Sequence, residues 1–480
     1  MTPYDDLPYV SRPFRQTHPD RLASMGLLLG MTPADPRTAH VLDVGCGSAL
    51  NLIAMAATLP DARFFGFDLA QTAVEQARSC IARLGLQNIR VEHMDLLEFP
   101  GDAGEFDYII AHGFYSWVPE EVREALLALV NRHASPHAIC YLSFNARPGS
   151  TLRLAWREAA AYHAHGIIDP VERAQASVRM LELMAETSAA RPGAWRDIVT
   201  EMVDAVHAKG IRWVGHDDFG PVFEPFHFHE VAEAAARHGM QYLSDACHFD
   251  SQPYELGDPA REILQDLEQR DLLLREQYFD FLELRPFRQI LLCRSGVALR
   301  RPIDTAGLRQ MSFSSAADET GAAADGQIVV SNPLTGSRSE VGELSRAILR
   351  QLRAAWPCSM PFAQVLPAQA DRDEIALRVE RLWACALIEA HAVAQRCGRG
   401  TEERPVVWHL ARLEAADGTT VTTRIHSQCI VDDVTRDLLR LLDGSRSRSE
   451  LIARFPDLQR RLDWLARMGL LEPADESTPA

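Results

Sequence analysis

The feature that most constrains the fold is a glycine turn between two apolar segments, at residues 41–51 (VLDVGCGSALN). Asp43 ends the first apolar segment, and Gly45 and Gly47 form the turn. A buried strand, a tight glycine turn and a helix in this order open a dinucleotide-type α/β unit. A second apolar run, FFGF, ends in Asp68, where an acidic residue can bind the two hydroxyls of a ribose. The two motifs together predict an adenosine-bearing cofactor.

The spacing of the glycines indicates which cofactor is bound. NAD sites use G-x-G-x-x-G, with a helix N-terminus beside the pyrophosphate. Here the third glycine position is Leu50, and the turn reads D-x-G-x-G. This turn resembles motif I of class I S-adenosylmethionine (SAM)-dependent methyltransferases, in which no pyrophosphate has to be held. The resemblance implies SAM as cofactor and S-adenosylhomocysteine (SAH) as product; an α/β domain without a nucleotide is the alternative.

Apolar runs and amphipathic helical segments alternate along residues 38–148. This pattern predicts a Rossmann-like α/β core with a parallel sheet, helices on both faces, and a site at the carboxyl ends of the strands. We assign the core and its N-terminal lead-in to residues 1–150, and a helical middle domain, regulatory or lid-like, to residues 151–296. The run RQILLCRS would return to the core sheet as a late antiparallel strand.

The tail, residues 297–480, has a different character. The segment 312–326 (SFSSAADETGAAADG) is small and polar, which is typical of a linker or exposed loop. Two weakly similar units follow, each with two helices and a closing phrase (WACALIE and WLARMGLLE), and VVWHLARLE and VTTRIHSQCIV are expected to be strands between them. The pattern predicts an α+β, winged-helix-like domain that could consist of two diverged copies.

Composition limits the classes of function. The chain has 480 residues, enough for two to four domains, and a net charge of −17, which argues against a nucleic-acid surface. The nine cysteines are scattered without a C-x-x-C pair, as expected of reduced thiols in a cytoplasmic protein. No signal peptide and no apolar run long enough to cross a membrane is visible, so membrane insertion is not expected.

The predicted cofactor contacts lie at the ends of the first three strands. Methyl transfer from SAM is an in-line displacement at an activated methyl group, so the protein mainly positions and desolvates. We expect the glycine turn to line the methionine part, Asp68 to bind the ribose and Asp95 to meet the adenine, although Asp95 could instead cap a helix. The full set of predicted contacts is Asp43, Gly45, Cys46, Gly47, Asn51, Asp68, Leu69, Asp95, Leu96 and His112.

The predicted catalytic residues follow the fourth and fifth strands. The fourth is followed by HGFYSWVPEE, which places His112, Tyr115 and Trp117 where the methyl group should emerge. Aromatic faces suit a cationic acceptor, and His112 could act as a base or orient the acceptor; a packed aromatic cluster is the alternative. Asn145, after the fifth strand, is a polar contact to the acceptor or an Asn that closes a turn. These residues differ from the N-P-P-Y motif of amide and base N-methyltransferases.

A group of histidines and acids could suggest a metal site. His216, Asp217 and Asp218 lie close together in the sequence, with His227 and His229 nearby. Such residues can ligate zinc or iron, but their spacing lacks a supporting pattern and methyl transfer needs no metal. We therefore predict no metal, and pocket-lining or structural histidines instead.

Several longer phrases resemble one bacterial family. They are YDDLPY and PFRQTHPDRLA near the N-terminus, AHGFYSWVPEEVREAL, SFNARPG, and EQYFDFLELRPFRQILLC. They are similar to class I methyltransferases that carry a methyltransferase regulatory domain, a family that includes the rickettsial outer-membrane-protein lysine methyltransferases. The resemblance covers residues 1–296 and, loosely, the tail. It implies a SAM-binding core, a helical middle domain, a C-terminal domain and N-methylation of a protein lysine.

The resemblance also implies roles for residues. It gives SAM contacts to Asp43, Gly45, Gly47, Asp68, Asp95 and His112, and it places Tyr4, Tyr9, Tyr115, Trp117 and Asn145 near the acceptor. The chain departs from the family pattern at Phe114, where a smaller residue is expected, and at Phe144, where a tyrosine is expected. Phe144 lacks a hydroxyl that could contact the substrate, so the acceptor preferred by this chain could differ from lysine.

The tail suggests a partner. The phrase RDLLRLLDGSRSRSELIARF resembles small winged-helix peptide-recognition domains of ribosomal-peptide tailoring enzymes, which bind a leader peptide as an added edge strand. We therefore expect a protein or peptide substrate docked by the C-terminal domain; a tail that caps the core or forms a homodimer is the alternative.

The leading hypothesis is a methyltransferase that acts on a protein or peptide side chain, most simply a lysine or another amine. Three alternatives stay open: tailoring of a ribosomally made peptide at a carboxylate, hydroxyl or amine, methylation of a small molecule, and SAM binding without catalysis.

Overall fold

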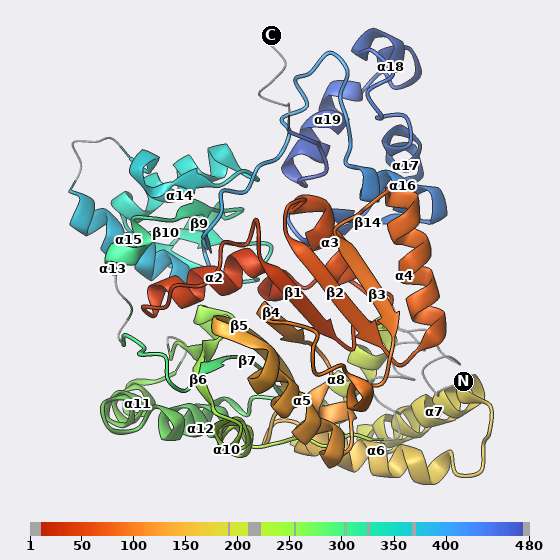
Figure 1. The fold of residues 1–480 in the computed structure, drawn as a ribbon, viewed down its shortest axis with the longest axis vertical. Coiled ribbons are helices and arrows are strands. Elements are labelled where there is room, and N and C mark those ends of the chain that lie inside the picture. The colour runs from red at the N-terminus through yellow and green to blue at the C-terminus, as the bar shows by residue number, and fades with distance from the viewer. Residues whose placement is uncertain are drawn as a thin grey trace.

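The computed structural model describes residues 11–190, 193–209, 222–253, 256–301, 303, 305–323, 327–366 and 371–473. Tyr4, Tyr9, His216, Asp217 and Asp218 lie outside the described residues. Figure 1 shows a central sheet with helices on both sides, a helical part below it, and two C-terminal parts above it.

A seven-stranded sheet with the order β3-β2-β1-β4-β5-β7-β6 forms the core. The strands are β1 (His40–Val44), β2 (Arg63–Asp68), β3 (Ile89–His93), β4 (Phe106–Ala111), β5 (Ala134–Asn145), β6 (Met240–Asp245) and β7 (Phe287–Arg294). The first five are parallel, and β7 is antiparallel to both β5 and β6. The predicted parallel core and the late antiparallel strand are thus confirmed, whereas β6 was not predicted.

Alternating side chains of the strands build two buried layers. On β1, Val41 belongs to one apolar cluster, while Leu42 and Val44 belong to the other, as the period of a strand requires. The first cluster includes α2 (Pro19–Leu28), α3 (Leu50–Thr58) and α4 (Gln71–Leu84), and the second includes α5 (Glu120–His133) and α10 (Phe228–Arg237). Burial of both faces explains the near-continuous apolar runs in the strand sequences.

The middle part of the chain lies between β5 and β7 in sequence and is largely helical, as predicted. Its helices are α6 (Thr151–His163), α7 (Pro170–Ala189), α8 (Ala194–Lys209), α10, α11 (Asp258–Arg270) and α12 (Leu272–Glu283), with the short η4 (His248–Ser251). α11 and α12 are separated at Asp271. This residue has extended backbone and caps α12 by accepting from the N–H groups of Leu273 and Leu274.

The first C-terminal part corrects the prediction of a linker at residues 312–326. Ser312–Ser314 form the buried strand β8, and Asp318–Ala322 form β9. The helices here are α13 (Thr305–Leu308), α14 (Glu343–Ala355) and α15 (Arg372–Ala384), and the remaining strands are β10 (Ile328–Ser331), β11 (Arg338–Val341), β12 (Met360–Pro361) and β13 (Glu389–His391). β8 is the central strand of the sheet β12-β8-β13, whereas β9 is an exposed edge strand. Small polar residues can form a buried strand when neighbouring strands pair with it, which local composition does not reveal.

The last part is a small helical unit with a two-stranded wing. It contains α16 (His409–Asp417), β14 (Thr420–Thr423), β15 (Ser427–Ile430), α17 (Asp433–Leu439), α18 (Arg448–Arg454) and α19 (Leu458–Arg467). The run VVWHLARLE, expected as a strand, has bridge residues only at Val406 and Val407 and continues as α16. The run VTTRIHSQCIV is a hairpin rather than one strand.

This last unit packs on the α3 and α4 side of the core. Trp408 and Leu438 belong to the same buried cluster as Leu52 of α3, and Figure 1 shows α16 beside α4. None of the described helices combines the length and apolar content needed to span a bilayer.

Candidate cofactor and acceptor site

The glycine turn after β1 is held close to the end of β2. The N–H groups of Gly45 and Cys46 donate to the carbonyl oxygen of Phe67 (3.0 and 3.1 Å). Gly45 has a φ of +70°, and a Cβ there would lie 2.6 Å from Cδ2 of Phe114. Only glycine combines this backbone conformation with this approach, so the ring of Phe114, where a smaller residue was expected, closes over the turn.

Asp68, at the end of β2, joins the turn to the next helix. Its Oδ2 accepts from the N–H of Gly47 (2.7 Å), and its Oδ1 accepts from the N–H of Ala70 (2.8 Å). These two bonds orient the carboxylate of Asp68, and a carboxylate oxygen can accept more than one hydrogen bond. The geometry fits the predicted binding of a ribose.

Asp43 lies at the end of β1 and is 4% exposed. Burial raises the pKa of its carboxyl to about 7, a hydrogen bond from Asn51 opposes this rise, and the charge of Asp68 adds to it. Cys46 is also buried, and burial raises the pKa of its thiol well above its ordinary value. Because the ionised carboxylate of Asp43 is costly without a ligand, a cationic group bound beside it would stabilise it. The amine of the methionine part of SAM is such a group.

Asn51 makes contacts that the sequence did not predict. Its Oδ1 accepts from the N–H of Phe14 (2.9 Å) and from Nε2 of His426 (2.8 Å), and its Nδ2 donates to Oγ1 of Thr17 (3.1 Å). The residue therefore joins the start of α3 to the N-terminal lead-in and to the C-terminal wing. A direct contact between Asn51 and SAM stays a prediction.

The predicted cofactor contacts after β2 and β3 differ in their exposure and in their hydrogen bonds. Asp95 caps the short helix η2 (Leu96–Glu98) by accepting from the N–H of Leu97 (3.0 Å). Leu96 is buried, and Leu69 is 40% exposed. The cap was the alternative for Asp95; one carboxylate can accept both this bond and one from an adenine amino group, so the adenine contact stays a prediction.

His112, directly after β4, belongs to a chain of polar contacts. Its Nδ1 lies 2.8 Å from the hydroxyl of Tyr141, which donates to Oε1 of Gln289 (2.7 Å). Nε2 of Gln16 donates to the same Oε1 (2.6 Å). Burial lowers the pKa of His112 to about 3, and its ring lies against Phe14, with the ring centroids 3.7 Å apart. Tyr141, Gln289 and Gln16 were missed because they lie on three segments far apart in the sequence.

The other predicted acceptor residues differ in exposure. Tyr115 is buried between the rings of Phe144 and Phe226, and burial raises the pKa of its phenol to about 12. Trp117 is half-buried, packs against Phe223, and lies beneath the guanidinium of Arg153.

Asn145 is buried, and its side chain is already engaged. Its Oδ1 accepts from Nη1 of Arg153 (3.1 Å), and its backbone N–H donates to Oγ of Ser116 (2.8 Å). The fifth strand thus ends beside the loop that contains Trp117. The acceptor roles of Tyr115, Trp117 and Asn145 stay predictions.

A buried ionic cluster fixes the middle domain to the sheet. Arg288 of β7 is fully buried and donates to Oδ1 of Asp245 (2.6 Å), Oε2 of Glu276 (2.8 Å) and Oδ1 of Asp280 (2.8 Å). Burial raises the pKa of Asp280 to about 7. Arg288 therefore neutralises carboxylates that could not be buried alone.

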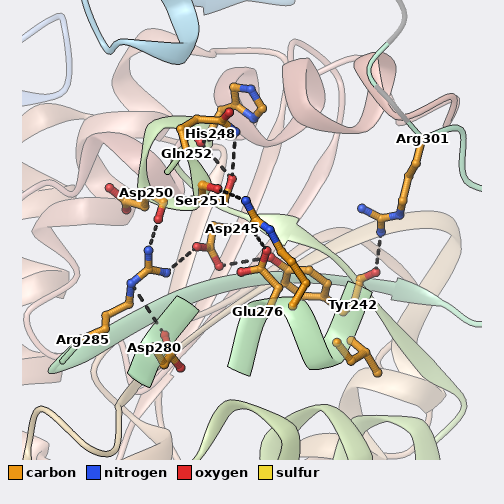
Figure 2. A network of polar contacts seen from close by, with 12 residues as sticks. Tyr242, Asp245, His248, Asp250, Ser251, Gln252, Glu276, Asp280, Arg285 and Arg301 are labelled. Carbon is orange, nitrogen blue, oxygen red and sulfur yellow. Dashed lines mark hydrogen bonds and ion pairs between the residues drawn. The ribbon is translucent and has the colours of Figure 1, made fainter. Parts of the chain in front are cut away.

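The same cluster continues to η4. Figure 2 shows Asp245 between the side chains of Arg285 and Tyr242; Arg285 donates to Oδ2 of Asp245 (2.8 Å) and to the backbone oxygen of Asp250. His248 of η4 stacks on Trp383 of α15, with the ring centroids 4.3 Å apart. The cluster thus links the edge of the sheet to the first C-terminal part.

The described residues contain no group of three or more His, Cys, Asp or Glu side chains arranged to hold a metal ion. His227 and His229 stack on each other, and His229 contacts Gln277 through Nδ1 (2.9 Å). His216, Asp217 and Asp218 fall outside the described residues.

Comparisons with protein families find three domains in the chain. A methyltransferase domain matches residues 41–137, a domain described as "Predicted methyltransferase regulatory domain" matches 212–294, and a "PKMT, C-terminal winged helix domain" matches 403–461. The fold and the first match define the class: the chain carries the Rossmann-like domain of SAM-dependent methyltransferases. More particularly, it combines this domain with the regulatory domain and the PKMT winged helix, as its sequence predicted.

Individual relatives align with parts of the chain. An uncharacterized protein of Rickettsia prowazekii (strain Madrid E) is 30% identical over 65% of this chain, and a second one is 29% identical over 50%. The alignments cover 56% and 96% of these relatives, so the chain spans about half the length of the first.

Solved structures share the fold of nearly the whole chain. PKMT2 from Rickettsia typhi, alone and in complex with AdoHcy, has TM-scores of 0.84 and 0.85 over 96% and 97% of this chain and 100% of the solved chain, at 21% identity. At this identity the likeness shows the fold. SAM, the predicted cofactor, is the cofactor of the methyltransferase class.

Proposed function

We propose that the protein transfers a methyl group from SAM to a lysine amine of a protein substrate. The observation that carries the proposal is the PKMT winged helix at residues 403–461 in the same chain as a methyltransferase domain, on a fold shared with PKMT2. Methylation of a ribosomally made peptide, of a small molecule, or SAM binding without catalysis are the alternatives that the experiment below separates.

The residues at the carboxyl ends of β1 and β2 fit SAM. The backbone of Gly45 and Gly47 would approach the methionine part, Asp43 would pair with its amine, and Asp68 would accept from the ribose hydroxyls. SAM supplies the activated methyl group when bound. The chain's own residues then have to hold the acceptor in line and exclude water.

His112 is proposed to orient the acceptor. Because Gln289 Oε1 can only accept, the hydroxyl proton of Tyr141 points to it, and the hydroxyl oxygen accepts from Nδ1–H of His112. Nε2 is then the acceptor, and it has no hydrogen-bond partner within the described residues. A lysine must be neutral to attack, and a group with a pKa of about 3 is too weak a base to deprotonate an ammonium. Nε2 is therefore suited to accept from a neutral amine.

Desolvation would supply the neutral amine. A lysine that enters an apolar site has a lowered pKa, and the rings of Phe14 and Phe114 lie at His112 and at the glycine turn. We propose that these rings and Trp117 hold the alkyl chain and the amine.

Docking of the substrate is proposed for the wing of the last unit. β15 is the outer strand of a two-stranded sheet, and its other edge pairs with no strand among the described residues. Ile430, at its end, is 77% exposed. A peptide could add to this edge through backbone hydrogen bonds.

A cytoplasmic location is also proposed. All nine cysteines are free thiols, which supports a reducing, cytoplasmic location.

The test is intact-mass spectrometry of proteins and peptides encoded beside the gene, and of a lysine-rich outer-membrane protein, each incubated with the full chain and SAM. A gain of about 14 Da per methyl group, localised to lysine by fragmentation, is the expected result. A gain on a carboxylate or hydroxyl of a short peptide would favour peptide tailoring, and a gain on a metabolite would favour a small-molecule acceptor. SAM binding without any methylated product would overturn the enzyme assignment. Asp68→Asn is the matched control, because weaker SAM binding should reduce the gain in each case when SAM is not in excess.

A further inference from the structure

The turn of the C-terminal wing reaches the helix that follows the glycine turn. His426 lies between β14 and β15, has a φ of +56° and is 3% exposed. Its Nε2 donates to Oδ1 of Asn51 (2.8 Å), although the two residues are 375 positions apart. Asn51 is the second residue of α3. A residue of the last unit is thus hydrogen-bonded to the first turn of α3, which follows the glycine turn of the proposed cofactor site.

The contact has a defined chemistry. The backbone N–H of Phe14 donates to the same Oδ1 of Asn51, which fixes that atom as an acceptor. Nε2 of His426 must therefore carry a proton. Burial and the neighbouring His18, Arg21 and Arg15 hold the pKa of His426 well below its ordinary value, so the ring is neutral and Nδ1 carries no proton. The bond is a neutral one between two buried partners. Loss of Asn51 would leave Nε2 of His426 without this acceptor, and loss of His426 would leave Oδ1 of Asn51 with fewer donors.

Asn51 also interacts with two further parts of the proposed cofactor site. Its Nδ2 donates to Oγ1 of Thr17 (3.1 Å), and the side chain of Asn51 lowers the pKa of the buried Asp43 carboxyl at the end of β1, against the larger rise that burial causes. The lead-in that contains Thr17 also covers the glycine turn, because the N–H of Ser48 donates to Oγ of Ser11 (3.2 Å). The start of α3, the lead-in and the wing therefore meet at one buried amide.

We infer that the wing belongs to the cofactor site, with His426 as a positioning residue that holds Asn51, and through it Asp43 and the lead-in, in the arrangement that binds SAM and SAH. The inference rests on the cofactor site of the proposed function. Its consequence is a two-way coupling: a partner that moves the wing changes the affinity for the cofactor, and the cofactor stabilises the wing by the same factor.

The first experiment measures the dissociation constant of SAH by calorimetry on the full chain. His426→Asn keeps a residue that tolerates a positive φ but shortens the side chain, so that the bond to Asn51 is lost. We expect about tenfold weaker binding, as for loss of one buried hydrogen bond. Gln428→Ala, in the same hairpin and without contact to Asn51, is the matched control and should bind SAH like the wild type.

A double-mutant cycle separates coupling from general damage. With Asn51→Ala as the partner, the double variant should bind SAH no more weakly than Asn51→Ala alone, because both changes remove one interaction. Additive losses, or a His426→Asn variant that only lowers the melting temperature and binds SAH normally, would overturn the inference. A wild type that does not bind SAH would instead overturn the cofactor site itself.

A second experiment needs no variant. Hydrogen exchange of the wild type, with and without SAH, should show added protection at residues 420–431, far in sequence from the predicted cofactor contacts. Unchanged exchange there, together with protection at residues 43–70, would also overturn the inference.

Discussion

Asp43→Asn is expected to stabilise the free protein while weakening its cofactor binding. The carboxyl is 4% exposed, and its pKa rises from an ordinary value of 3.8 to about 7, mainly through burial. Each tenfold change in proton affinity corresponds to about 1.4 kcal/mol, so ionised Asp43 costs the fold about 4 kcal/mol above pH 7. An amide of the same shape avoids this cost. It also removes the charge proposed to pair with the amine of methionine.

The sign of the pH dependence follows from linkage. Because the folded state holds the proton of Asp43 more tightly than the unfolded state, the stability of the wild type falls as the pH rises from about 4 to about 7. The advantage of the Asn variant should therefore grow over this range and level off above it.

Chemical denaturation of both proteins at a series of pH values, without ligand, measures the difference in the free energy of unfolding. Calorimetry with SAH at about pH 8 should show at least tenfold weaker binding to the variant. A stability difference that does not change with pH, or a variant less stable than the wild type at pH 8, would refute the reasoning.

Three further predictions concern other parts of the site. Asp68→Asn removes the carboxylate that accepts from the turn and should weaken SAH binding at least about tenfold by calorimetry, because a charged hydrogen bond contributes about 1.5–3 kcal/mol; unchanged affinity would contradict the ribose contact. Arg288→Met leaves buried carboxylates unpaired and should lower the free energy of unfolding by about 3–5 kcal/mol in urea, whereas the exposed Arg261→Ala should change it by less than about 0.5 kcal/mol; similar effects of both would contradict the role of the cluster. Tyr141→Phe removes the acceptor for Nδ1–H of His112 and should lower kcat about tenfold with SAH affinity unchanged; a loss confined to SAH affinity would place the contact in cofactor binding instead.

The sequence was sufficient where the signal is local. The alternation of apolar residues on β1 and the positive φ at Gly45 are properties of neighbouring residues, so a pattern in the chain reports them directly. The same holds for Asp68, whose place at the end of β2 follows from the length of the preceding apolar run. These features predicted the sheet, the glycine turn and the class of cofactor.

The predictions failed where a segment takes its structure from its surroundings. Ser312–Ser314 form a strand because β12 and β13 pair with it on both sides, although their composition is typical of a loop. Met240–Asp245 form β6 at the edge of the core sheet, beside a strand more than forty residues later in the sequence. Pairing of this kind depends on distant partners, which a local pattern does not contain.

The sequence by itself therefore determined the Rossmann-like core, the D-x-G-x-G turn and the acid at the end of β2, because each is encoded within a few consecutive residues. Only the tertiary structure decided that His112 contacts Tyr141 and Gln289, and that His426 of the wing contacts Asn51. Buried polar groups must find partners wherever packed surfaces meet, and which groups meet depends on how the last unit docks against the core. The physical reason is that backbone conformation is set by neighbours in sequence, whereas hydrogen bonds between domains are set by neighbours in space.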